Sequence, residues 1–179
     1  MGDYSRFYAT VFAWQKGGVK EAEGQMTLME ILSGSSVIVG LEGQDKHEIL
    51  QEIVEAVDEQ KITDREKVLE AVRQREEIMS TGIGHGIAIP HGKSEYVKEL
   101  GGVLGIKREG VDFDSLDGKS TFIFFLLVSP LDVSGPHIKA LARISRLLKG
   151  EDFRKRLIDA ADKEEAISFI IEEEEKQYA

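Results

Sequence analysis

The chain has 179 residues, 41% of them hydrophobic and 31% charged, a length and balance that predict one globular domain with its own core. Its formal net charge of −10, without a local cluster of basic residues, argues against nucleic acid as a partner, because an acidic surface repels phosphate backbones. The absence of cysteine excludes disulfides, thiolate metal sites and a cysteine nucleophile. The sequence shows neither an apolar run that spans a bilayer nor a secretory signal, so we expect a cytoplasmic protein with no membrane insertion.

The N-terminal residues 1–25 differ in pattern from the rest of the chain. They mix aromatic residues with a Gly17-Gly18 break, and a regular pattern starts only at Met26. We therefore expect a domain over residues 26–179 and an N-terminal extension over 1–25, either disordered or a mis-assigned start. The alternative is a segment that packs on the domain through its aromatic side chains.

One strand and two helices are predicted before the middle of the chain. Val37–Val39 is a short apolar strand, and from Asp45, a candidate cap, the hydrophobic residues recur at helical spacing. The second helix is predicted to run from a capping box at Thr63–Glu66 to about Met79.

A glycine-punctuated loop around a short apolar strand covers Thr81–Gly92. Two strands follow, near Val103–Lys107 and Thr121–Val128. The second is apolar throughout, which predicts a central strand covered on both faces.

Three helices close the chain. The first opens at Gly135-Pro136, with proline at its first position, and ends at Gly150. The others are expected near Phe153–Ala160 and Glu164–Glu174. Strands that alternate with helices predict the α/β class, with a single-domain mixed β-sheet flanked by helices on both faces.

Arg75 interrupts the apolar stripe of its helix, between Val72 and Met79. A guanidinium that faces inward keeps its charge and therefore requires an anion. That anion can be a ligand, and the alternatives are a structural salt bridge or a side chain that reaches the surface near the helix end.

His137 lies in the first turn of its helix, just after Pro136 and on the apolar side. Free backbone N–H groups and the helix dipole favour an anion there. The alternative is a histidine whose hydrogen bonds are satisfied at the edge of the core.

His91 follows a short strand, and glycines surround it at Gly82, Gly84, Gly86 and Gly92. Glycine permits close backbone approach, so backbone donors can surround an exposed imidazole. The alternative is an ordinary loop histidine. His85, in the same loop, is not assigned a role. No two histidines lie four residues apart on a helix, and we expect no metal site.

The segment REEIMSTGIGHGIAIPHGK, Arg75–Lys93, resembles the active-site segment of the mannitol/fructose/nitrogen-regulatory class of enzyme IIA of the bacterial phosphotransferase system. The segments Gly110–Asp114, Phe124–Pro130 and Gly135–His137 are similar to the same class. The resemblance covers roughly Met26 to Glu174.

This resemblance implies a phosphotransferase whose phosphoacceptor is His91, with Arg75 and His137 matching an arginine and a second histidine of the phosphoryl site. We expect binding through the backbone from three of the glycines around His91, namely Gly84, Gly86 and Gly92. A histidine phosphocarrier protein is the implied donor, and a IIB protein or a regulated target protein is the implied acceptor. No cofactor is implied.

Three functions stay open at this point. The first is a phosphohistidine carrier of the nitrogen-regulatory type, which the free-standing form and the segment GIAIPHGK favour. The second is a fructose- or mannitol-specific IIA that passes phosphate to a IIB protein during sugar uptake. The IIB acceptor in such carriers is a cysteine, so it must lie on another chain. The third is a non-catalytic binding module.

Overall fold

The structure is a computed structural model, and it describes residues 27–178. The expected extension over residues 1–25 lies outside the described residues, and the domain boundary at residue 26 stays a prediction.

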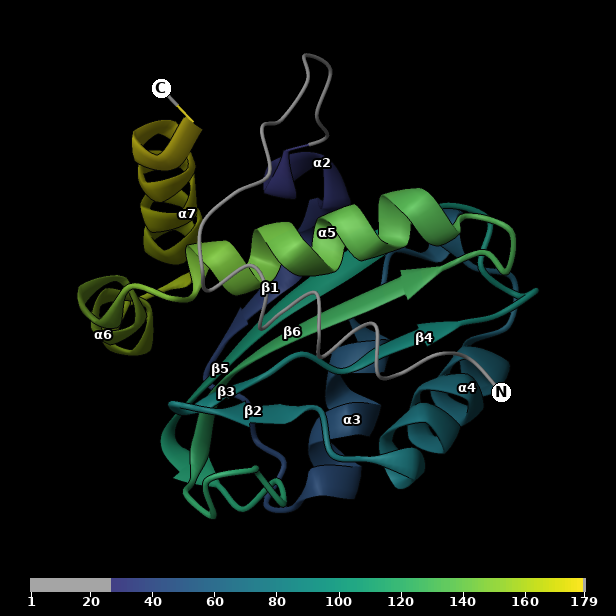
Figure 1. Cartoon of the computed structure of the whole chain (residues 1–179), viewed down its shortest axis with the longest axis horizontal. Coiled ribbons are helices and arrows are strands. Elements are labelled where there is room, and N and C mark those ends of the chain that lie inside the picture. Colours follow the sequence, from purple (N-terminus) through teal and green to yellow (C-terminus); the bar gives the residue numbers. More distant parts are fainter. Residues whose placement is uncertain (1–26, 179) are drawn as a thin grey trace.

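A mixed β-sheet runs through the middle of the described chain (Figure 1). Its six strands are β1 (Leu32–Val39), β2 (Gly82–Gly84), β3 (Ile87–Ala88), β4 (His91–Lys93), β5 (Gly101–Val111) and β6 (Thr121–Ser129). The order across the sheet is β1-β5-β6-β3-β2, and β4 pairs with β6 further along that strand than β3 does. The pairs β5–β6 and β2–β3 are antiparallel, whereas β1 lies parallel to β5, and β3 and β4 lie parallel to β6.

Helices cover both faces of this sheet (Figure 1). One face carries α3 (Lys46–Glu55) and α4 (Arg65–Ile78), which the short 3-10 helix η1 (Glu59–Lys61) separates in the chain. The other face carries α2 (Leu28–Ile31), α5 (Ser134–Leu147), α6 (Glu151–Asp159) and α7 (Lys163–Tyr178). The predicted α/β architecture, a mixed sheet flanked by helices on both faces, is confirmed.

Strand β6 separates the two hydrophobic cores. From residue 123 to residue 128, its odd-numbered residues pack with α2, α5, α6 and α7, and its even-numbered ones pack with α3 and α4. These residues are Ile123, Phe125 and Leu127 in the first core and Phe124, Leu126 and Val128 in the second. Because side chains alternate along a strand, only an apolar residue at every position can supply both cores. The prediction of a central strand is confirmed.

The start of α4 differs from the prediction. Its N-cap is Asp64, whose carboxylate accepts a hydrogen bond from the Lys67 backbone N–H at 3.1 Å. Thr63 instead donates its hydroxyl to the carbonyl of Tyr96. The capping box expected at Thr63 is therefore wrong: the charged acceptor one residue later caps the helix.

The ends of α5 also differ. The helix begins at Ser134, so Pro136 is its third residue rather than its first, and it ends before Leu148, its C-cap. Gly150, expected at the end of this helix, is the N-cap of α6. Proline is tolerated at the third position because the N–H groups of a first helical turn have no intrahelical acceptor.

The four-residue helix α2 was not predicted from the sequence. Thr27 and Glu30 form a capping box at its start, with hydrogen bonds of 3.2 Å and 2.7 Å. Between residues 27 and 178, none of the helices combines the length and apolar character needed to cross a bilayer.

Candidate functional site

Three elements that are distant in the sequence meet beside the C-terminal half of β6 (Figure 1). Arg75 comes from the last turn of α4, His91 is the first residue of β4, and His137 lies in the first turn of α5. The rings of His91 and His137 lie 5.8 Å apart, and Nε of Arg75 lies 3.2 Å from Nε2 of His91. The structure thus brings together the three residues that interrupted their local patterns.

The ring of His91 is held at both nitrogens. Nδ1 lies 2.9 Å from the carbonyl oxygen of Ile89, so this nitrogen donates and carries the hydrogen. Nε2 accepts from Arg75, which places the lone pair of the neutral ring on Nε2. Both contacts therefore select the same tautomer, with Nε2 as the nucleophilic atom.

Burial keeps this imidazole neutral. His91 is 9% exposed, and desolvation lowers its pKa from 6.5 to about 4. The Ile89 carbonyl opposes that change in pKa, whereas the Arg75 guanidinium adds to it. At neutral pH the ring is uncharged, as a nitrogen nucleophile must be.

Arg75 is 7% exposed, which contradicts the alternative in which its side chain reaches the surface. Nη1 donates to the carbonyl of Met79 at 2.9 Å, while Nε donates to His91. The side chain therefore spans from the end of α4 to the nucleophilic nitrogen. A guanidinium in this position supplies planar, permanently charged donors.

His137 is 4% exposed, and its Nδ1 lies 2.7 Å from the hydroxyl of Ser129, the last residue of β6. Burial lowers the pKa of His137 to about 3, and electrostatic interactions with His91 and Lys93 lower it further. The site therefore holds two neutral imidazoles and one guanidinium.

The three glycines expected at the site have different surroundings. A Cβ atom at Gly92 would lie 3.1 Å from Cγ2 and 3.2 Å from the backbone N of Val72, so glycine lets α4 lie close against β4. Since Arg75 follows Val72 on the same face of α4, this approach brings its side chain to His91.

Gly84 and Gly86 do not lie at the histidine pair. They flank the turn between β2 and β3, with φ of 88° and 77°, and the carbonyl of Gly86 accepts from the backbone of Ile123. His91 is in register with Leu127, so the two places are about 13 Å apart along β6 at 3.3 Å per residue. These two glycines serve the turn, because their positive φ suits glycine.

His85 lies in that same turn and is exposed. Its φ is 56°, and its backbone N–H donates to the Asp117 carboxylate at 3.0 Å. It therefore lies outside the site.

Sequence reasoning missed several residues beside the three. Ser129 and the carbonyl of Ile89 orient the rings, and Nζ of Lys93 donates to the hydroxyl of Ser134 at 2.6 Å, at the start of α5. Strand alternation could have identified Lys93 from the sequence. Residues two apart in a strand lie on the same face, and Lys93 is two residues after His91. Within the described residues, no group of three His, Cys, Asp or Glu side chains is arranged to hold a metal ion.

A mixed sheet covered on both faces, with a neutral imidazole faced by a guanidinium and a second histidine, is the arrangement expected for the enzyme IIA class of phosphotransferase-system proteins. The family described as "Phosphoenolpyruvate-dependent sugar phosphotransferase system, EIIA 2" matches residues 30–173. The chain belongs to this family.

Relatives of two kinds are similar to the chain. The PTS system fructose-specific EIIABC component of Bacillus subtilis (strain 168) is 36% identical over 152 residues, which is 84% of this chain and 24% of that protein. A nitrogen regulatory protein of Bradyrhizobium diazoefficiens is 32% identical over 145 residues, 81% of this chain and 95% of that protein. The crystal structure of the nitrogen regulatory protein IIA-Ntr from Neisseria meningitidis has a TM-score of 0.74 at 30% identity, over 79% of this chain and 97% of that one. The chain thus spans about a quarter of the EIIABC component and nearly all of the two nitrogen regulatory proteins.

Proposed function

We propose that this chain is a phosphohistidine carrier, which accepts a phosphoryl group from a histidine phosphocarrier protein onto Nε2 of His91. The observation that carries the proposal is the tautomer of His91. The Ile89 carbonyl takes the hydrogen of Nδ1, and Arg75 points at the lone pair of Nε2. A buried, neutral and oriented nitrogen next to a permanent positive charge is what in-line phosphoryl transfer requires.

In the proposed step, the lone pair of Nε2 forms a bond to phosphorus as the bond between phosphorus and the donor's ring nitrogen breaks. The bonding electron pair returns to the donor's nitrogen. His91 keeps the hydrogen on Nδ1, so its ring gains positive charge, and the carbonyl of Ile89 stabilises that charge. Arg75 neutralises the oxygens of the transferred group.

His137 supplies a further donor if its hydrogen is on Nε2. The Ser129 hydroxyl, 2.7 Å from Nδ1, can donate to that nitrogen and so select this tautomer. The Nε2–H group is then available to a phosphoryl oxygen. Burial keeps His137 neutral by lowering its pKa, and a neutral second ring does not repel the positive charge that develops on His91.

Exposed apolar side chains near the site support docking of the donor protein. Ile78 and Met79 lie at the end of α4, and Leu131 and Ile138 lie before and within the first part of α5. These are the two elements that carry Arg75 and His137. Single exposed hydrophobic residues need no explanation, but a group around one site is typical of a protein contact.

We further propose that the chain acts in the cytoplasm mainly as a phosphorylation-switched regulator. Support comes from the match to nearly the full length of nitrogen regulatory proteins. A phosphoryl group adds roughly −1.5 to −2 charge at neutral pH. Within an apolar rim this charge disfavours a docked apolar partner, and no refolding is needed. The second candidate is a fructose-type sugar carrier, which the identity to the EIIABC component favours.

The phosphoryl carrier is tested by incubation with phosphoenolpyruvate and the general phosphotransferase proteins. We expect one acid-labile phosphoryl group per chain, and its position on Nε2 is read by ³¹P and ¹⁵N NMR. Labelling of a His91→Ala variant to the wild-type level would contradict the assignment of the acceptor.

To distinguish the regulator from the sugar carrier, partner proteins are captured from the native host with the wild-type chain and with the His91→Ala and His91→Asp variants. A partner that binds one charge state and not the other supports regulation. If a IIB protein were the single specific partner and received the phosphoryl group rapidly, the result would favour the sugar carrier and contradict the regulator.

A further inference from the structure

Glu76, the residue after Arg75, carries a buried carboxylate outside the phosphoryl site itself. It is 5% exposed and has three partners. Oε1 accepts from the backbone N–H of Thr81 at 3.0 Å and pairs with Nζ of Lys46 at 2.8 Å, and Oε2 accepts from the hydroxyl of Thr81. Burial of a carboxylate costs free energy unless hydrogen-bond donors and a counter-ion compensate its charge. The burial of Glu76 together with three such partners therefore indicates a specific role.

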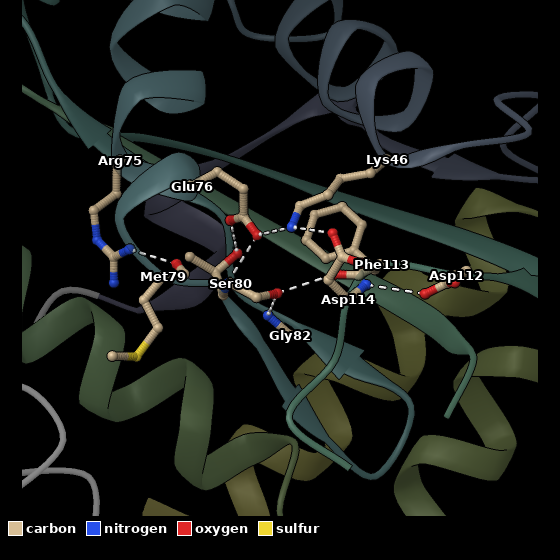
Figure 2. Close-up of polar contacts among 10 residues, drawn as sticks. Lys46, Arg75, Glu76, Met79, Ser80, Gly82, Asp112, Phe113 and Asp114 are labelled. Atoms are coloured by element: carbon tan, nitrogen blue, oxygen red, sulfur yellow. Dashed lines mark hydrogen bonds and ion pairs between the residues drawn. The ribbon is translucent and has the colours of Figure 1, made fainter. Parts of the chain in front are cut away.

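Lys46 reaches Glu76 from the first residue of α3. Its Nζ also lies 3.2 Å from the Asp114 carboxylate and 5.0 Å from the centre of the Phe113 ring (Figure 2). In Figure 2, Glu76 points toward Lys46, whereas Arg75 leaves α4 in another direction, toward Met79. The two neighbouring residues of opposite charge are therefore kept apart, each with its own partners.

The turn that Glu76 holds, Met79–Thr81, leads to both functional groups of the site. The carbonyl of Met79 accepts from Nη1 of Arg75 at 2.9 Å. The carbonyl of Thr81 accepts from the backbone N–H of Ile89 at 3.0 Å, and the carbonyl of Ile89 accepts from Nδ1 of His91 at 2.9 Å. Two short series of hydrogen bonds thus connect this turn with the guanidinium and with the imidazole.

We propose that Glu76, with Lys46 as its counter-ion, is a positioning residue of the phosphoryl site. It holds the turn that orients Arg75 and selects the tautomer of His91. Lys46 neutralises Glu76, so the charge of Arg75 remains available to the phosphoryl group. The role of Glu76 in orienting Arg75 and His91 does not depend on the reaction. Its effect on phosphoryl transfer rests on the proposed phosphocarrier function.

The orientation is tested on the unphosphorylated chain by ¹⁵N NMR of the imidazole nitrogens. In the wild type we expect the hydrogen of His91 on Nδ1. In Glu76→Ala and Glu76→Gln we expect a mixture of tautomers, because the turn that supports Ile89 loses its charged acceptor. Glu77→Gln, the exposed neighbour, is the control for a local loss of charge. Glu174→Gln, which breaks the buried ion pair with Arg143, is the control for a general loss of stability.

The charge argument is tested by phosphoryl transfer at saturating donor. Lys46→Met keeps an unbranched side chain of similar length but leaves the Glu76 carboxylate uncompensated beside Arg75. We expect a maximal rate at least about tenfold lower, with the KM for the donor unchanged, because small misplacements of catalytic groups reduce rates by such factors. The double variant K46M/E76Q removes both charges and should transfer about as fast as Glu76→Gln alone, because no uncompensated carboxylate then remains beside Arg75.

The outcomes separate the two proposals. A wild-type chain that takes no phosphoryl group overturns the proposed function, while the tautomer of His91 still tests the positioning role. If Glu76→Ala does not fold, Glu76→Gln and Lys46→Met provide the same readings. The role of Glu76 would be overturned if Glu76→Gln and Lys46→Met both kept the wild-type tautomer of His91 and transferred within twofold of the wild-type rate. It would also be overturned if the rate losses of the two substitutions simply multiplied in the double variant, because Lys46 would then act independently of Glu76.

Discussion

Two histidines of one glycine-rich segment, His85 and His91, lie in opposite environments in this fold. His85 lies between two glycines in the turn from β2 to β3 and is exposed, with only its backbone held by Asp117. His91, next to Gly92 at the start of β4, is buried and has both ring nitrogens in hydrogen bonds. Their local sequences, Gly-His-Gly and Pro-His-Gly, do not differ in any way that determines this outcome.

The difference lies in what the rest of the chain brings to each position. Val72 of α4 lies against Gly92, and α5 places a second imidazole 5.8 Å from the first. His85 is exposed in its turn, so its ring keeps its hydration. A histidine becomes a candidate nucleophile here because two helices remove its water and orient its ring, and both helices come from other parts of the sequence.

The largest expected effect separates the two histidines directly. His91→Gln should abolish acid-labile phosphorylation, because an amide has no nucleophilic nitrogen, whereas His85→Gln should be labelled at the wild-type rate. Labelling by the donor protein with ³²P and quantification after gel separation measures both. Loss of labelling in a folded His85→Gln variant would show that the turn also belongs to the site.

The burial of His91 also predicts a pH dependence of stability. Its folded-state pKa is about 4, below the value of 6.5 for an exposed imidazole. Between those values the unfolded chain binds more protons than the folded one, so the stability due to neutral His91 is complete above pH 6.5 and is lost as the pH falls toward 4. The loss is on the order of 3 kcal/mol for one such group. Urea unfolding of wild type and His91→Gln between pH 7.5 and 4 measures it, and parallel curves would contradict the burial argument.

The next effect concerns the guanidinium of Arg75, which donates a hydrogen bond to His91. Arg75→Lys retains the charge but loses the planar donor pair, and we expect transfer to slow more than tenfold, about 1.4 kcal/mol or above. Stopped transfer assays at saturating donor measure the rate. Arg73→Lys, a half-buried arginine of the same helix, is the matched control and should transfer normally. Equal rates for the two variants would remove Arg75 from the proposed site.

The smallest effect compares the two glycines beside the two histidines. Gly92→Ala places a methyl group against the backbone of Val72 and shifts α4, which should slow transfer several-fold and cost about 1–3 kcal/mol of stability. Gly84→Ala requires a positive φ of 88°, and this strain should also cost about 1–3 kcal/mol. Its transfer rate should not change. Thermal unfolding with transfer assays distinguishes them, and slow transfer in Gly84→Ala would contradict the separation of turn and site.

Conflicts between a residue type and its local pattern marked residues that the structure brings together beside His91. An arginine on an apolar stripe and a histidine on the core side of a first helical turn identified Arg75 and His137 before their partners were known. The same reasoning could not distinguish Gly92 from Gly84 and Gly86, because glycine serves both close packing and a positive φ. Glu76 follows the pattern of a polar helix residue, and its burial against Thr81 and Lys46 is apparent only in the tertiary structure.

The sequence alone determined the α/β class, the central strand β6 and the three separated polar residues, because periodicity and residue type act over a few neighbouring positions. Three features follow from the tertiary structure alone: which nitrogen of His91 carries the hydrogen, which glycine adjoins this residue, and which carboxylate holds the turn beside Arg75. These features depend on distances between segments that are far apart in the chain. Such distances are set by the packing of α4 and α5 on the sheet, which no local pattern records.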